Sequence, residues 1–118
     1  MRWLIVPLFA LCLPACTIAV PDISSASVPD NPTYAHDVRP YLADHCLLCH
    51  SSPPDYGAPS TFRLDVLDYT GSIPGAQSMA KPMIDDVVSA NPHQMPPGNG
   101  LGPNGKRLLV NWFANSAP

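Results

Sequence analysis

The sequence lacks glutamate altogether and has few basic residues. Nine acidic side chains, all aspartate, oppose six lysines and arginines, which gives a formal net charge of −3 at pH 7. A nucleic-acid-binding domain carries a basic stripe or patch, and none is visible in this sequence, so we expect no nucleic-acid partner. With 118 residues, the chain is long enough for one small domain.

The chain also lacks an apolar run long enough to cross a bilayer as a helix. Its one long apolar stretch, residues 3–13, follows a basic start and has the outline of a secretory signal. The stretch ends in "LPAC", residues 13–16, which resembles a bacterial lipobox. We therefore expect a lipoprotein signal peptide over 1–15, export to the periplasm, and a membrane anchor through a lipid at Cys16. Ordinary signal cleavage nearby would instead release a free periplasmic protein.

Cysteine becomes scarce once the signal is removed. Of the four cysteines, Cys12 leaves with the signal and Cys16 would carry the lipid, so only Cys46 and Cys49 remain as thiols. A disulfide framework that needs all four cysteines is therefore excluded.

Proline, by contrast, is abundant, with sixteen in the chain. Residues 16–32 combine proline with serine, aspartate and small residues, show no periodicity, and are predicted to be a flexible tether. An ordered domain is expected over 33–118. Within it, apolar spacings predict a helix over about 38–48, another over about 81–89 with Pro82 in its first turn, and a closing helix that Pro103 or Asn104 can open.

This pattern predicts an all-α fold of three to four short helices joined by proline-rich loops. Helices this short enclose only a small core. The domain would therefore need an internal scaffold, such as a large buried cofactor.

The two remaining thiols belong to the motif Cys46-Leu47-Leu48-Cys49-His50, the C-x-x-C-H signature of c-type haem attachment. Two intervening residues allow one helical turn to present both sulfurs to the two vinyl groups of a haem, and the histidine can then ligate the iron. A redox thiol pair would follow a strand in a βαβ unit, which is not visible. A structural zinc needs four ligands, and the sequence has no second C-x-x-C or H-x-x-H pair. We expect one covalently bound haem c.

The iron then needs a sixth ligand or leaves an open site. Met95 is the predicted ligand, because it lies in "QMPPG", where paired prolines restrict the loop. A thioether favours reduced iron and raises the reduction potential. His93 would give a bis-histidine site instead, whereas Met79 and Met83 are expected in the core.

Residues 34–118 resemble a small class I cytochrome c domain. The resemblance is carried by "YAHDVRPYLADHCLLCH" at the opening helix and haem motif, by "QMPPG" as the distal methionine loop, and by "LLVNWFANSAP" as the closing helix. It implies a cytochrome c-like fold around one covalently attached haem. It also implies that Cys46 and Cys49 carry the haem, that His50 is the proximal ligand, and that Met95 is the distal ligand.

The same resemblance implies that the first and last helices cross. The expected contacts join Val38, Tyr41 or Leu42 to Leu109, Trp112 or Phe113. Arg63 and Lys81 are candidates for contacts with the haem propionates, because a fixed cation partly offsets those carboxylates.

The expected function is one-electron transfer in a periplasmic or membrane-surface chain, by a monomer that is not an enzyme. Its redox partners would be a dehydrogenase, an oxidase or another cytochrome. Two alternatives stay open: an open-site haem protein that binds a diatomic ligand or reduces peroxide, and a zinc-binding structural module.

Overall fold

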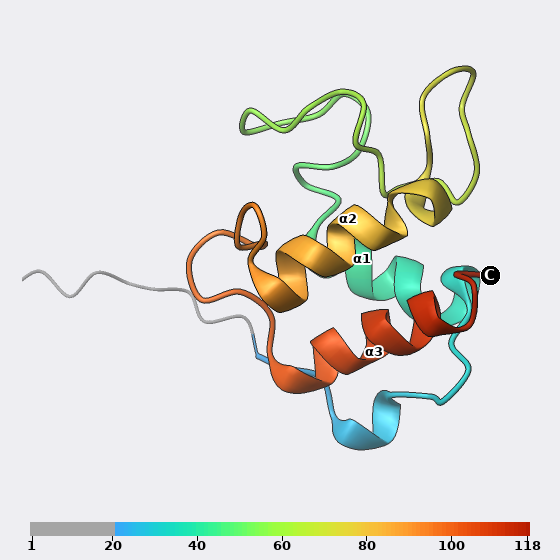
Figure 1. Cartoon of the computed structure of the whole chain (residues 1–118), viewed down its shortest axis with the longest axis vertical. Coiled ribbons are helices and arrows are strands. Elements are labelled where there is room, and N and C mark those ends of the chain that lie inside the picture. The colour runs from blue at the N-terminus through green and yellow to red at the C-terminus, as the bar shows by residue number, and fades with distance from the viewer. Residues whose placement is uncertain (1–20) are drawn as a thin grey trace, which may run out of the picture.

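The computed structural model of the protein describes residues 21–118. Its helical elements, in chain order, are a 3-10 helix Ser25–Ser27, a π-helical turn Tyr34–Val38, α1 Arg39–His45, α2 Ala76–Ser89 and α3 Pro103–Ala114 (Figure 1). Within 21–118 there is no strand, and the predicted all-α class is confirmed there. In the same residues no helix has the length and hydropathy to span a membrane. The predicted signal peptide and Cys16 lie outside the described residues.

The first helical segment begins as a π-helical turn and continues as α1. Pro40 lies in the first turn of α1, a position at which its fixed φ and missing N–H are well tolerated. The predicted helix over 38–48 is therefore correct at its start. It ends earlier than expected, at His45, because the chain then enters a series of tight turns.

The second helix is longer than predicted. It begins at Ala76 and not near Lys81, so Pro82 lies inside the helix and not in its first turn. The buried face of α2 consists of Ala76, Ala80, Met83 and Val87, and this stripe continues on both sides of the proline. Burial of the whole stripe offsets the one backbone hydrogen bond that Pro82 cannot make. The predicted end at Ser89 is correct.

The third helix forms the centre of the core. Figure 1 shows it beside α2, and its buried Leu109 and Trp112 pack with Val38 of the π-helical turn. The rings of Tyr34 and Trp112 lie 6.1 Å apart between centroids. The expected packing of the first helical segment against the last is present, and of the three alternatives on α3 it is Leu109 and Trp112 that are buried, whereas Phe113 is 39% exposed.

A close approach between α1 and α3 fixes how these helices pack. A Cβ atom added at Gly105 would lie 1.9 Å from the hydroxyl of the buried Tyr41. Glycine is required here because the tyrosine ring occupies the space that any other side chain needs.

We predict that Gly105→Ala destabilises the protein by about 1–3 kcal/mol, as overpacked sites usually do. The sign of this change in the free energy of unfolding is informative, because alanine in place of an unconstrained helical glycine stabilises a protein by about 1 kcal/mol. Urea unfolding followed by circular dichroism measures the change. Adding Tyr41→Phe, which removes the nearest atom, should recover part of the loss, and no recovery would contradict the proposed clash.

Residues 21–32 differ from the flexible tether that we expected. The segment runs along α3, and the side chains of Asn104, Arg107, Asn111 and Asn115 each donate a hydrogen bond to its backbone carbonyls. Pro32 is buried. The polar face of α3 thus holds an ordered arm.

Asp22 anchors the start of this arm. Its carboxylate accepts hydrogen bonds of 2.9 Å from the backbone N–H groups of Asn104 and Gly105, at the first turn of α3. These N–H groups have no partner within the helix, so Asp22 caps α3 from about 80 residues away in the chain. Burial acts to raise the pKa of Asp22, but the backbone hydrogen bonds outweigh it and hold the pKa below its ordinary value.

We predict that Asp22→Ala lowers the melting temperature at pH 7, whereas Asp22→Asn, which keeps one of the two accepting oxygens, lowers it less. Because the folded-state pKa lies below the unfolded one, the contribution of Asp22 is complete above the unfolded pKa and is lost as pH falls through the folded pKa. Thermal melts at neutral and acid pH test both points. If Asp22→Asn loses as much stability on acidification as the wild type, Asp22 is not the titrating group.

Candidate functional site

The cysteine motif forms the turns that follow α1. The backbone N–H of Cys46 donates to Leu42 at 2.7 Å, and those of Cys49 and His50 both donate to the carbonyl of Cys46, at 3.1 and 2.9 Å. Successive turns of this kind bring the two sulfurs and the imidazole close together in space. Both cysteines are half-buried and neither forms a disulfide.

Two adjoining pockets open beside this motif. The α2 pocket, of about 280 Å³, is lined by Cys46, His50, Pro59, Phe62, Leu64, Met83, Asp86, Val87, His93 and Met95. The loop pocket, of about 210 Å³, is lined by His45, Cys46, Cys49, His50, Tyr56, Gly57, Ala58, Pro59, Met95, Pro96 and Pro97. Both linings are predominantly apolar, and together the pockets reach the size of small-molecule and cofactor sites, roughly 300–1,000 Å³.

Four residues border both pockets: Cys46, His50, Pro59 and Met95. The structure thus brings together three of the residues that the sequence singled out, although Met95 comes from a loop far along the chain. Met95 is half-buried. His93, the alternative ligand, is exposed and lines only the α2 pocket.

His50 lies in the wall between the pockets with a free ring nitrogen. Its Nδ1 atom is buried and has no hydrogen-bond partner. The ring of Phe62 lies 4.9 Å away between centroids. Burial lowers the pKa of His50, and the backbone of Phe62 and the charge of Asp86 oppose this only in part. The imidazole is therefore favoured in its neutral form, which is the form that binds metal ions.

Burial shifts the pKa of Cys46 upward, opposite to its effect on the pKa of His50. Burial, and to a lesser extent the neighbouring Cys49, raises the pKa of the Cys46 thiol to about 12. A redox thiol needs its thiolate near neutral pH, which this burial disfavours, whereas a bound metal ion would itself deprotonate a coordinating thiol. A thioether has no ionisable proton, so burial imposes no such cost on it. Within residues 21–118, no group of three or more His, Cys, Asp or Glu side chains could hold a metal ion.

The two candidate cations for propionates have other partners. Arg63 donates to Asp65 through Nε at 2.9 Å and through a second, shorter contact, and it lines neither pocket. The hydrogen bond from Arg63 holds the pKa of Asp65 below its ordinary value. Lys81 pairs with Asp85 at 2.7 Å on an exposed part of α2. A propionate contact from Arg63 would first have to displace the aspartate.

Sequence reasoning missed Pro59, Phe62 and Asp86 as pocket residues. The first two lie in an irregular segment without periodicity, which offers no signal. Asp86 could have been found, because it follows Met83 by three residues and precedes the buried Val87 on α2. Residues three and four apart share one helix face.

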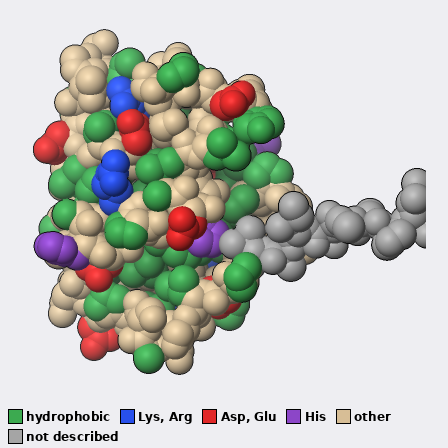
Figure 2. Space-filling model, turned by 180° about the vertical axis from the view of Figure 1, so that it is seen from behind, with side chains coloured by type: hydrophobic (Ala, Val, Ile, Leu, Met, Phe, Trp, Pro, Cys, Tyr) green, Lys and Arg blue, Asp and Glu red, His purple; other side chains and the backbone are tan. Residues whose placement is uncertain are grey.

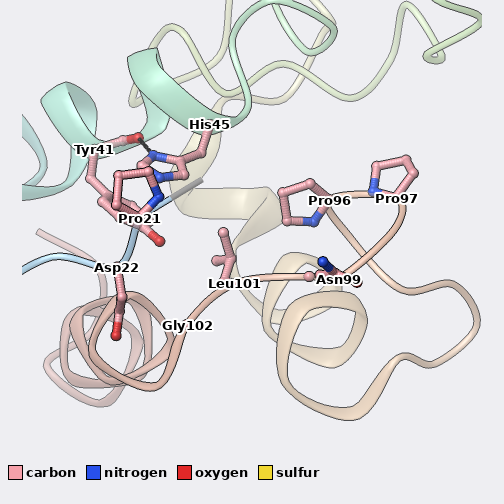
Figure 3. A pocket seen from close by; sticks show the side chains of 10 residues that line it. Pro21, Asp22, Tyr41, His45, Pro96, Pro97, Asn99, Leu101 and Gly102 are labelled. Atoms are coloured by element: carbon pink, nitrogen blue, oxygen red, sulfur yellow. Dashed lines mark hydrogen bonds between the residues drawn. The ribbon is translucent and has the colours of Figure 1, made fainter. Parts of the chain in front are cut away.

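A third pocket, of about 230 Å³, separates the arm from the methionine loop (Figure 3). Pro21 and Asp22 line it from the arm, Tyr41 and His45 from the first helix, and residues 96–97 and 99–102 from the loop. His45 stacks on Tyr41 at 4.1 Å between ring centroids, and its Nδ1 lies 2.8 Å from the Tyr41 carbonyl oxygen. His45 thus packs between this pocket and the loop pocket.

No protein-family model, curated protein or solved structure matches this chain. A functional conclusion therefore depends on the residues of the site. The relevant features are a pair of free cysteines, a half-buried imidazole whose buried Nδ1 has no partner, and a methionine that shares their pockets.

Proposed function

We propose that the protein is a one-electron carrier with a single haem c, joined covalently to Cys46 and Cys49 and ligated by His50 and Met95. The observation that carries the proposal is that Met95 borders the same two apolar pockets as Cys46 and His50. The C-x-x-C-H motif is specific for this cofactor, and the pockets offer it an apolar enclosure next to the core.

Each residue has a separate task in this proposal. The bound haem supplies an iron that alternates between two oxidation states. The two cysteines fix the cofactor, and His50 presents a neutral imidazole nitrogen. Met95 contributes a thioether, which favours the reduced state and raises the potential. Apolar walls, including Phe62, limit the access of water and so influence the potential as well.

The two alternative functions, an open-site haem protein and a zinc-binding module, require different chemistry at the site. An open-site haem protein requires that Met95 does not occupy the sixth position, although its side chain borders both pockets. A zinc module requires four ligands, and the cysteine motif supplies only Cys46, Cys49 and His50. Both alternatives predict measurable outcomes, namely rapid carbon monoxide binding by the reduced protein in the first case and bound zinc without colour in the second.

The proposed location is the periplasmic side of a membrane. If Cys16 carries a lipid, the five residues to Pro21 span at most about 18 Å. The arm that begins there is fixed to α3, so the domain would stay close to the lipid surface. Partners would be a dehydrogenase, an oxidase or another cytochrome, met through a small and transient interface.

Lysine and arginine do not gather into a large basic patch on the face shown in Figure 2, where they lie among hydrophobic and uncharged side chains. Docking on this face would therefore not depend on a ring of lysines.

The proposal is tested by the cofactor content of the protein after export in a host that matures c-type cytochromes. The purified protein should be red, and the colour should stay with the polypeptide after acid–acetone extraction. In alkaline pyridine it should give the spectrum of a c-type haem with one haem per chain. A folded, colourless protein, with or without zinc, would overturn the proposal.

A further inference from the structure

Asp86 is a carboxylate on the wall of an otherwise apolar pocket. It lies on α2 between Met83 and Val87, both buried, and lines the α2 pocket together with His50 and Met95. Its side chain is thus directed to the pocket that contains both proposed axial ligands.

The charge of Asp86 has no cationic partner within residues 21–118. The ion pairs there join Arg63 to Asp65 and Lys81 to Asp85. The Oδ1 atom of Asp86 accepts one hydrogen bond, of 3.3 Å, from the backbone N–H of His93. An uncompensated negative charge beside a pocket of low polarity acts strongly on any charge placed inside it.

We propose that Asp86 tunes the reduction potential of the site by stabilising the oxidised state. This inference rests on the proposed function, because it concerns the haem iron. Oxidation adds one positive charge at the centre, and a carboxylate on the pocket wall attracts the more positive state. The effect opposes that of Met95, so Asp86 keeps the potential below the value that the histidine–methionine ligand pair would give alone.

Asp86→Asn tests the proposal with little change of shape. Asparagine retains the oxygen that accepts from His93, so only the charge is removed. At a fixed solution potential, the ratio of reduced to oxidised protein should rise on the order of tenfold. For a one-electron couple this corresponds to a midpoint about 59 mV more positive.

Asp85→Asn is the matched control. It removes the same charge from the neighbouring residue, whose side chain is 43% exposed, pairs with Lys81 and does not line the pocket. We expect a change in the ratio of less than about threefold, which salt should abolish because exposed charges are screened. The effect of Asp86→Asn should persist at high salt. Equal shifts in the two variants, or no shift in Asp86→Asn, would overturn the proposal.

Two further measurements separate the possible outcomes. Asp86→Ser, a second neutral variant, should shift the ratio in the same direction, which covers the case that Asp86→Asn does not fold. One outcome is that the wild type holds covalent haem with the spectrum of a histidine–methionine site, while the Asp86 variants have the same reduction potential as the wild type. In that case only the proposed role of Asp86 is wrong. If the wild type holds no haem, the proposed function fails and the tuning role fails with it.

Discussion

The variant in which serine replaces both Cys46 and Cys49 should retain no covalently attached haem. A hydroxyl does not form the thioether that joins haem to a cysteine, so any haem left in the variant is held by its axial ligands alone. Haem staining of a denaturing gel, together with the intact mass of the chain, measures the covalent product. We expect the staining to fall to background and the mass to match that of the mature chain without haem.

The same variant should also fold poorly. The α2 pocket is bordered by the buried residues Leu64, Met83 and Val87, which belong to the hydrophobic core. Without the cofactor these side chains would lose packing partners on one side. Circular dichroism should therefore show a weak, non-cooperative melt, and a cooperative melt like that of the wild type would contradict this expectation.

Cys16→Ser is the control for these measurements. It removes the proposed lipid attachment and leaves the C-x-x-C-H motif untouched. The variant should leave the membrane fraction and keep its covalent haem. Covalent haem in the double serine variant would show that Cys46 and Cys49 are not the attachment sites.

Met95→Ala should convert the site into one with an open sixth position. The far-red absorption band assigned to methionine bound to ferric iron should disappear, and the reduced protein should bind carbon monoxide rapidly. Loss of the thioether also removes a ligand that favours reduced iron, so the midpoint potential should fall by an amount on the order of tenths of a volt. Absorption spectroscopy and redox titration record these changes.

His93→Ala provides the comparison for Met95→Ala. His93 lines the same α2 pocket but is exposed, so its loss should leave the far-red band and the slow reaction with carbon monoxide as they are in the wild type. The reverse result, in which His93→Ala opens the site and Met95→Ala does not, would indicate bis-histidine ligation.

The sequence predicted those parts of the structure that depend on local patterns. The all-α class and the third helix followed from the spacing of apolar residues, and the start of α1 lies where this spacing placed it. The proximity of Met95 to Cys46 and His50 was expected from the haem motif and the methionine loop, and both pockets bring these residues together.

Features that depend on tertiary contacts were not predictable. The start of α2 was placed too late because Pro82 is typical of a first turn, and only the buried stripe on both sides explains a helix that continues through it. The arm was read as a tether because its composition is that of a linker. Its order comes from Asp22 and from the polar face of α3, and no pattern within residues 21–32 encodes that contact.

The side-chain partner of Arg63, near the site, could not be predicted from the sequence either. The sequence offers a cation near the haem motif but does not reveal that Asp65 engages it. Asp86 was not predicted to line the pocket either, although its spacing from Met83 on α2 offered a signal.

An optical redox titration of the purified full-length protein tests most directly whether it is a one-electron carrier. We expect a reversible change between the oxidised and reduced spectra of a c-type haem. The ratio of the two forms should change tenfold for every 59 mV, as a one-electron couple requires. A protein whose absorption does not respond to the applied potential would contradict the proposal that it carries electrons on a haem.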